Sequence, residues 1–423
     1  MLNLKVERGE QTLVPPMDPS YNRGTQYFLS NFDFIFARKM STVYCFKPMD
    51  HNRENYDDEQ VVEVIKNALS KVLVPYYPMA GRLSIGSNGR PVVDCTGEGA
   101  IFVEAKASCT IEEIGDDTVL MKELVCDTSA FKSIWELPPL CAQVTKFKNG
   151  GLVLGICMNH MIADGISASE FFNAWGDIAR GLPLNAPPFL DRGILSARNP
   201  PKFEYPHDEF SLYKDISNFD DLYKEEIIYK SFCLDHEKVE KLKMAAMEDG
   251  TLDKCSTFEV ISSFIWKNRT QALKPHRDQT TKLLSVVDAR SRFDPPLPEN
   301  YFGNGVTLTG ELTEKPLSYA VKLVQESIRM VTDDYMKSAI DYMEVKIPSR
   351  FLAATTFAIT TWTRLSLGAI DFGWGEPFLM GPGYLPPKEL VFLLSHPKDK
   401  KSFTVLLSLP ASSMKIFEEL MHI

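Results

Sequence analysis

The residues best suited to chemistry form the segment His160-Met161-Ile162-Ala163-Asp164-Gly165. An imidazole at the rim of a core can act as a general base, because its surroundings can tune its pKa near neutrality. Asp164 follows four residues later, and Gly165 permits a tight turn in which Asp164 folds back to brace the loop. Spacing alone leaves a catalytic and a structural role equally open, since one such pair arises by chance in roughly one chain in three.

A second group is Asp371-Phe372-Gly373-Trp374-Gly375, followed by Gly381-Pro382-Gly383. Two glycines around a tryptophan indicate a backbone that approaches another group closely, and Asp371 can hold such a loop by accepting hydrogen bonds from its amides. A glycine-rich loop with a buried aromatic residue is more often scaffold than catalyst, so the pattern favours a structural role.

The first segment lies between an expected strand and an expected helix. Residues 152–159 form an apolar run of strand length, typical of a sheet covered on both faces. The next residues, 166–180, have helical periodicity, with one apolar face made by Ala168, Phe171, Phe172, Trp175, Ile178 and Ala179. Ligands bind at such strand ends in open α/β sheets, so His160 stands at a favourable position.

Both halves of the chain mix strands and helices without a strict βαβ order, which predicts an α/β protein with two domains. Strands are expected at 41–47, within 92–103, and at 142–147, 226–234, 283–287, 357–362, 390–395 and 403–409. Helices are expected from Asp57 or Asp58 to Val72, after Asp235, after Ser256 or Thr257, over 318–331 and after Pro410. The proline-rich residues 182–215 read as an extended crossover between domains 1–181 and 216–423.

Composition excludes several classes of protein. The 423 residues are 44% hydrophobic, too many for a disordered chain, and no apolar run approaches the roughly 18 residues of a membrane-spanning helix. The net charge of −10 argues against a nucleic-acid partner. Charges at Lys5, Glu7, Arg8 and Glu10 leave no room for a signal peptide. The chain has eight cysteines and no C-x-x-C pair. Together with the expected lack of a signal peptide, this composition predicts reduced, mostly buried thiols and a cytoplasmic location.

Familiar catalytic signatures are absent from the sequence. It has no Walker loop, no dinucleotide fingerprint, no G-x-S-x-G elbow and no clustered metal ligands. We therefore expect no metal and no permanently bound cofactor, but a substrate that is already activated.

Together the two motifs resemble those of the plant BAHD acyl-CoA-dependent acyltransferases, which carry H-x-x-x-D-G near the middle and D-F-G-W-G near the C-terminus. The likeness covers essentially the whole chain. It includes the segments 77–83, 287–292, 295–298 and 301–304.

The resemblance implies a chloramphenicol-acetyltransferase-like fold, with two similar α/β domains and an active-site channel between them. His160 would be the general base, acyl-CoA the co-substrate, and no acyl-enzyme would form. The resemblance places Asp164 and Asp371 with His160 in the catalytic motifs, although both look structural. Asp164 would pair with an arginine, for which Arg290 is the first candidate and Arg292 the second.

The same resemblance assigns supporting roles. Thr360 and Trp362 match positions that line the oxyanion and acceptor side, although a buried strand with one polar face explains them equally well. Ser256 and Thr257 match a helix start near the CoA nucleotide, although capping alone accounts for both. Structural roles are expected for Gly165, Arg290, Gly373, Trp374 and Gly375.

A finer likeness is to hydroxycinnamoyltransferases of suberin and wax synthesis that act on omega-hydroxy fatty acids or fatty alcohols. It rests on residues 27–31, 96–100, 198–202 and 310–320. Relatives that acylate shikimate or quinate have an arginine where this chain has Ile347, while Arg350 is out of register. An apolar wall is expected instead from Phe351, Leu352, Phe357 and Ala358.

The sequence thus predicts a monomeric O-acyltransferase that moves a feruloyl, caffeoyl or coumaroyl group from CoA to an apolar hydroxyl compound. Three alternatives stay open: N-acylation of a polyamine, O-acylation of shikimate, quinate or a specialised alcohol, and a non-catalytic relative that binds acyl-CoA.

Overall fold

The computed structural model describes residues 4–48, 58–114, 120–309, 316–346, 352–384, 389–397, 399 and 401–422. The chain divides into two compact units. Unit 1 comprises Met1–Ser196, Pro298–Gly305 and Leu365–Leu385. Unit 2 comprises Ala197–Leu297, Val306–Arg364 and Pro386–Ile423. The domain bounds at 181 and 215 stay a prediction.

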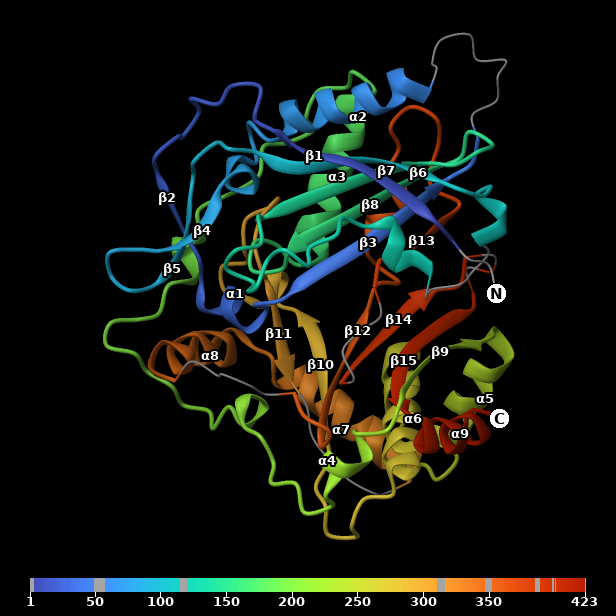
Figure 1. Cartoon of the computed structure of the whole chain (residues 1–423). Helices are drawn as coiled ribbons and strands as arrows, with labels where there is room; N and C mark the ends of the chain where they lie inside the picture. The colour runs from blue at the N-terminus through green and yellow to red at the C-terminus, as the bar shows by residue number, and fades with distance from the viewer. Residues whose placement is uncertain are drawn as a thin grey trace. The chain divides into compact units, whose positions relative to one another are not determined.

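Unit 1 is built on a six-stranded sheet (Figure 1). Its strands lie in the order β1 (Val6–Val14), β6 (Ala100–Ala107), β7 (Leu140–Lys146), β8 (Leu152–Asn159), β3 (Lys39–Phe46) and β13 (Leu379–Pro382). Only β6 and β7 run parallel. Every residue of β8 is buried, as its continuous apolar run predicts. A small second sheet has the order β2 (Gln26–Phe28), β5 (Pro91–Asp94) and β4 (Arg82–Ile85).

The helices of unit 1 are α1 (Asn31–Ile35), α2 (Asp58–Val72) and α3 (Gly165–Ala179). Short 3-10 helices lie at Tyr77–Ala80, Glu112–Ile114, Leu120–Leu124, Arg192–Leu195 and Ser366–Ala369. Helices α2 and α3 pack against each other, and the indole of Trp175 donates a hydrogen bond to the Ile65 carbonyl at 2.8 Å. This contact fixes α3, and with it the turn that precedes α3.

Unit 2 has its own six-stranded sheet (Figure 1). The order is β11 (Val306–Thr309), β10 (Lys282–Asp288), β12 (Thr356–Thr361), β14 (Leu390–Ser395), β15 (Phe403–Pro410) and β9 (Ile227–Leu234). Strands β10, β12 and β14 run parallel, and the other pairs are antiparallel.

The helices of unit 2 are α4 (Phe219–Leu222), α5 (His236–Met247), α6 (Thr257–Leu273), α7 (Leu317–Met330), α8 (Asp333–Val345) and α9 (Ala411–Leu420). Two 3-10 helices lie at Asp208–Phe210 and Arg290–Arg292. Helix α6 contacts α5, α7 and α9, and contributes most of its residues to the buried core.

The predicted strands and helices are present, with ends that move by a few residues, except that 92–103 is divided into β5 and β6 by residues 95–99. Both predicted caps are present: the Asp235 carboxylate accepts from the amide of Lys238, and Ser256 forms a capping box with Glu259. Asp57, offered as a helix start, lies outside the described residues. The prediction missed the strands β1, β2, β4, β11 and β13 and the helices α1, α4 and α8. Strand β1 is mostly exposed at a sheet edge, so its sequence lacks the apolar pattern that marked the other strands.

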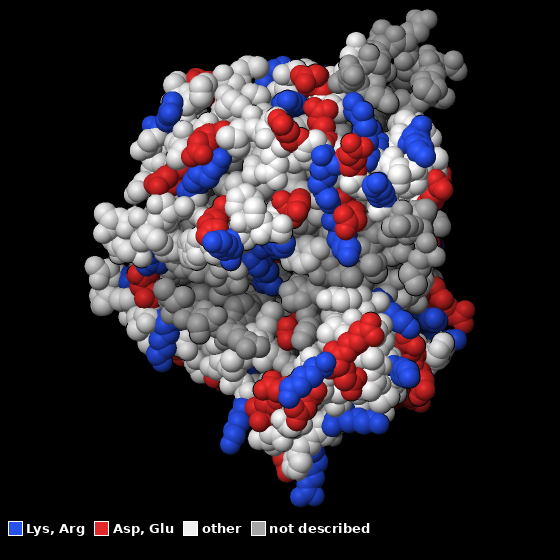
Figure 2. Space-filling model, in the orientation of Figure 1, with Lys and Arg blue, Asp and Glu red and all other residues white. Residues whose placement is uncertain are grey.

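The acidic excess is not gathered on the face shown in Figure 2, where acidic and basic side chains are interspersed. Six cysteines are buried and all eight are free thiols, as predicted. Within the described ranges, no helix combines the length and apolarity needed to cross a membrane.

Candidate active site

His160 directly follows β8, in unit 1. Its amide donates to the carbonyl of Arg38 at 2.9 Å, just before β3, which pairs with β8. Its imidazole stacks on the ring of Phe36, with centroids 4.8 Å apart and an interplanar angle of 14°. The Nδ1 atom is buried and makes no hydrogen bond to the described residues. The backbone of His160 is therefore fixed, and its ring is held by stacking on Phe36 while Nδ1 is left without a hydrogen bond to the described residues.

The His160 ring is neutral at physiological pH. Burial is the main cause that lowers its pKa, and the Arg38 guanidinium lowers it further, to about 4. The Asp164 carboxylate and the Asn304 amide oppose this shift. The pKa thus lies below the near-neutral value expected from the sequence, because the strand end is more buried than its rim position implied. A neutral imidazole is the form that accepts a proton.

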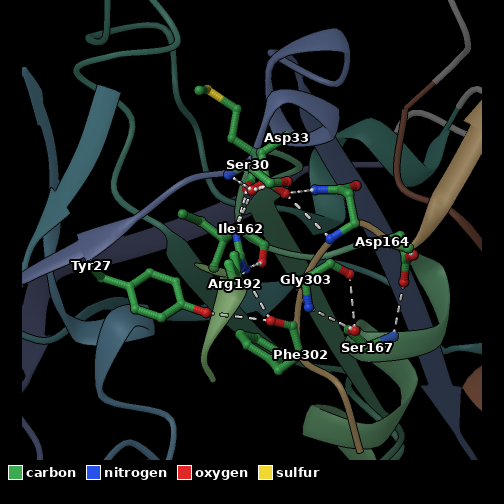
Figure 3. Close-up of polar contacts among 12 residues, drawn as sticks. Tyr27, Ser30, Asp33, Ile162, Asp164, Ser167, Arg192, Phe302 and Gly303 are labelled. Atoms are coloured by element: carbon green, nitrogen blue, oxygen red, sulfur yellow. Dashed lines mark hydrogen bonds and ion pairs between the residues drawn. The ribbon is translucent and has the colours of Figure 1, made fainter. Parts of the chain in front are cut away.

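A buried ion pair holds the turn after His160 (Figure 3). The side chains of Arg192 and Asp33 are fully buried, and Arg192 Nη1 lies 2.9 Å from Asp33 Oδ2. Arg192 also donates to the carbonyls of Met161, Ile162 and Phe302. One guanidinium therefore joins three chain segments around the turn through hydrogen bonds to backbone and to Asp33, and it also lies 4.8 Å from the centroid of the Tyr27 ring.

Asn304 extends this network to His160. Its Nδ2 donates to Asp33 Oδ1 at 2.8 Å and to the His160 carbonyl at 2.9 Å. Both amide protons are thus used, and the carbonyl side of the His160 peptide is fixed. The contact ties the position of His160 to the same buried carboxylate that holds Arg192.

Asp164 caps helix α3. Its Oδ1 accepts from the amides of Ile166 and Ser167 at 3.1 Å, and its Oδ2 accepts from the amide of Gly305 at 2.9 Å. The carboxylate is buried and directed at backbone amides at a helix N-terminus, where negative charge is favoured. A Cβ at Gly165 would lie 2.6 Å from Leu365 Cδ1, so the half-buried Leu365 side chain would have to shift to admit a larger residue.

Asp371 organises a loop at the other end of α3. Its Oδ1 accepts from the amides of Gly373 and Gly375, both at 2.8 Å, and its Oδ2 lies 3.2 Å from Arg180 Nη1. Both glycines have positive φ, 113° and 104°, so the loop needs residues without a Cβ. Within the same motif, the Phe372 and Trp374 rings stack at 5.7 Å.

The two motifs are separated by the length of α3. The Asp371 carbonyl lies so close to Gly176 that a Cβ there would be 2.5 Å away. Gly176 is eleven residues beyond Gly165, which corresponds to about 16 Å along a helix axis. Asp371 therefore lies too far from the His160 turn to exchange a proton with it directly.

The remaining predicted site residues belong to unit 2. Thr360 is half-buried on β12. Trp362 follows this strand, is 6% exposed, and packs edge-to-face on Phe392 with centroids 4.9 Å apart. Of the predicted apolar wall, Phe357 and Ala358 are buried in β12. Phe351 of that wall lies outside the described residues, as do Ile347 and Arg350, which were compared with the arginine of shikimate-acylating relatives.

The arginine and capping candidates of unit 2 have local partners. Arg290 Nη1 lies 3.2 Å from Asp288 Oδ1, and Arg292 donates to the carbonyl of Val331 at 3.0 Å. The Ser256 hydroxyl accepts from the amide of Glu259 at 3.3 Å, which leaves Thr257 as the first residue of α6. The proposed pairing of Asp164 with Arg290 stays a prediction, as does the CoA role of Ser256 and Thr257.

Sequence reasoning missed Asp33, Arg192, Asn304 and Arg38. Asp33 and Arg192 are 159 positions apart, so no local spacing connects them. The one available signal was the position of Asp33 in the otherwise apolar run 32–36, since a carboxylate there is buried only with a partner. Within the described residues, no group of three or more His, Cys, Asp or Glu side chains is placed to hold a metal ion.

Comparisons with known proteins identify the family of the chain. The model of the Transferase family matches residues 4–423. The chain is 52% identical to omega-hydroxypalmitate O-feruloyl transferase of Arabidopsis thaliana, over 99% of this chain and 93% of that protein. It is 47% identical to fatty alcohol:caffeoyl-CoA acyltransferase of the same plant, over 99% of both chains.

Two solved structures share the fold. Vinorine synthase has a TM-score of 0.77 at 22% identity, over 97% of this chain and 96% of its own. Fusarium graminearum TRI101, in complex with coenzyme A and T-2 mycotoxin, has a TM-score of 0.75 at 16% identity, over 92% and 96%. The predicted two-domain α/β fold class is thereby confirmed.

Proposed function

Since the chain belongs to the BAHD acyltransferase family and is an acyltransferase, we propose that it transfers a hydroxycinnamoyl group from CoA to the hydroxyl of a long-chain acceptor. The donor would carry a feruloyl, caffeoyl or coumaroyl group, and the acceptor would be an omega-hydroxy fatty acid or a fatty alcohol. The observation that carries this proposal is near full-length identity of 52% and 47% to two enzymes with such names.

His160 is the proposed general base. Its neutral imidazole takes the proton of the acceptor hydroxyl as that oxygen attacks the thioester carbonyl. The C–O bond forms, and the carbonyl oxygen carries the negative charge of a tetrahedral intermediate. When the intermediate collapses, the C–S bond breaks and the CoA thiolate takes the proton back from the imidazolium. Each proton and electron pair is accounted for without an acyl-enzyme.

Asp164 and Asp371 are proposed to position the site and not to contact reacting atoms. The Asp164 carboxylate is occupied by three backbone amides of the His160 turn and its surroundings. The Asp371 carboxylate is occupied by two loop amides and Arg180, and this supports a role for Gly373, Trp374 and Gly375 as scaffold.

The proposed roles of five unit 2 residues rest on the family resemblance. Thr360 and Trp362 stay candidates for the oxyanion and acceptor side, and Ser256 with Thr257 stays a candidate for binding CoA. Arg290 stays the first candidate for a partner of Asp164. A cytoplasmic location and a monomeric state are likewise proposed from the sequence.

A donor-by-acceptor screen tests the function. The purified protein is incubated with feruloyl-, caffeoyl- or coumaroyl-CoA and one of four acceptors: 16-hydroxyhexadecanoate, 1-hexadecanol, shikimate or spermidine. Mass spectrometry measures the ester or amide, and a thiol reagent measures free CoA. We expect ester formation and equal CoA release with the long-chain acceptors, and at least tenfold lower kcat/KM with shikimate and spermidine.

Other outcomes identify the alternatives. Preferred turnover of spermidine would show an N-acyltransferase, and preferred turnover of shikimate a polyol-acid acyltransferase. Binding of hydroxycinnamoyl-CoA without turnover of any acceptor would show a non-catalytic relative. Each of these results would overturn the proposed function.

A further inference from the structure

Arg38 lies beside His160 and has no assigned role. Its carbonyl accepts the His160 amide proton, and its guanidinium carbon lies 5.4 Å from the centroid of the Phe36 ring. That ring stacks on the His160 imidazole at 4.8 Å. Taken together, the two distances place the guanidinium carbon of Arg38 no more than about 10 Å from the centroid of the imidazole.

The positive charge of Arg38 is uncompensated among the described residues. No described carboxylate forms an ion pair with it, in contrast to the buried pair of Arg192 with Asp33. Burial lowers the pKa of Arg38, and the Tyr384 side chain alone opposes this. Arg38 is partly buried and lies over the Phe36 ring, so its charge is held close to the His160 imidazole without a carboxylate partner among the described residues.

Among the described residues, two charged groups act on the His160 ring. Arg38 lowers its pKa, whereas Asp164 raises it, and the Asn304 amide also raises it. The Asp164 carboxylate already accepts from three backbone amides, which spread its charge. The imidazolium form of His160 would therefore face a nearby guanidinium with little compensation, and like charges repel most strongly where water is excluded.

We propose that Arg38 is a positioning residue for acyl transfer, whose positive charge beside the Phe36–His160 stack disfavours the imidazolium form of His160 and so extends its proton-accepting range to lower pH. The inference rests on the proposed role of His160 as the general base. Arg38 contributes through the electrostatic field and needs no contact with substrate.

The test compares Arg38→Met, which removes the charge at similar length, with Arg38→Lys, which keeps it. In substrate-free protein, NMR titration of the His160 imidazole should give a pKa roughly 0.5 to 1 unit higher in Arg38→Met than in wild type. This readout needs no turnover, so it stays interpretable if the proposed function fails. Arg38→Lys should titrate close to wild type.

The pH profile of kcat/KM gives the second readout. In Arg38→Met the acid limb of the kcat/KM profile should move to higher pH. Below that limb, kcat/KM should be three- to tenfold lower than in wild type, and at pH 8 it should change less than twofold. Lys39→Met is the matched control, because Lys39 is the exposed neighbouring cation, and it should leave the profile unchanged. The melting temperature of Arg38→Met should equal or exceed that of wild type.

Two results would overturn the inference. One is the same His160 titration in wild type and Arg38→Met, which would show that the charge of Arg38 does not act on the ring. The other is an equal loss of kcat/KM at every pH together with a lower melting temperature, which would show a structural role.

Discussion

Two histidines in this chain, one in each unit, have opposite surroundings. Both ring nitrogens of His207 are satisfied: Nδ1 lies 2.8 Å from Glu209 Oε1, and Nε2 lies 2.8 Å from Ser338 Oγ. In contrast, His160 Nδ1 is buried without a hydrogen bond to the described residues. An imidazole with both nitrogens in hydrogen bonds stabilises the structure around it. An imidazole with a nitrogen that makes no hydrogen bond within the protein can exchange a proton with a substrate.

The supporting groups differ in the same way. Around His207, the supporting groups connect helix α8 to the segment 198–207. The Ser338 hydroxyl also accepts from the amide of Glu204 at 3.0 Å, and Asp341 pairs with Arg198 at 2.6 Å. These contacts attach the proline-rich crossover to α8. Around His160, Arg192, Asn304 and Asp164 bind mainly backbone groups, and Nδ1 of the ring is left without a hydrogen bond to the described residues. The comparison therefore separates a histidine that anchors a segment from one that is presented for chemistry.

The largest effect on stability is expected from Asp33→Ala. It leaves the fully buried Arg192 guanidinium without its carboxylate, and such a change costs about 3–5 kcal/mol. Urea unfolding of the variant measures this loss. The double variant Asp33→Leu with Arg192→Met should unfold with a smaller loss than Asp33→Ala, because it leaves no buried charge. A loss below about 1 kcal/mol in Asp33→Ala would contradict the assigned role of the pair.

Acid should destabilise the protein through His160. Its pKa is lowered from 6.5 to about 4 in the folded state, so the unfolded chain binds the proton first as the pH falls. The free energy of unfolding should drop between pH 6.5 and pH 4 by on the order of 3 kcal/mol from this group. In His160→Gln the drop over this range should be smaller by that amount. Parallel pH profiles of the two proteins would show that the ring is not held in its neutral form.

A smaller effect is expected from His207→Ala. Loss of the two hydrogen bonds leaves Glu209 and Ser338 without their imidazole partner, which costs roughly 1–3 kcal/mol. The melting temperature should fall, while kcat/KM of the folded variant stays within about twofold of wild type. His207→Gln, which can keep one of the bonds, is the matched control and should lose less. A tenfold fall in kcat/KM without a change in melting temperature would reverse the comparison.

The sequence predicted the parts of the site that depend on local patterns. The apolar run of β8, the helical face of α3 and the cap at Ser256 each follow from residues close together in the chain. The His160 turn follows from two of these elements. The role of Asp164 as a brace was also foreseen, because Gly165 marks the tight turn.

What the sequence could not predict depends on contacts between distant residues. The pairing of Asp33 with Arg192 and the amide contact of Asn304 with His160 join positions that are 159 and 144 residues apart. The low pKa of His160 depends on how completely the fold buries its ring, which no spacing encodes. Strand β1 was missed because an exposed edge strand needs no apolar pattern.

The most direct test of the central claim is kcat/KM of His160→Ala with feruloyl-CoA and 16-hydroxyhexadecanoate at pH 7.5, measured beside its melting temperature. General-base catalysis typically contributes about 10²–10⁴-fold, so a loss of that size is predicted, with a melting temperature close to that of wild type. A folded His160→Ala variant that turns over within about threefold of wild type would contradict the assignment of His160 as the base.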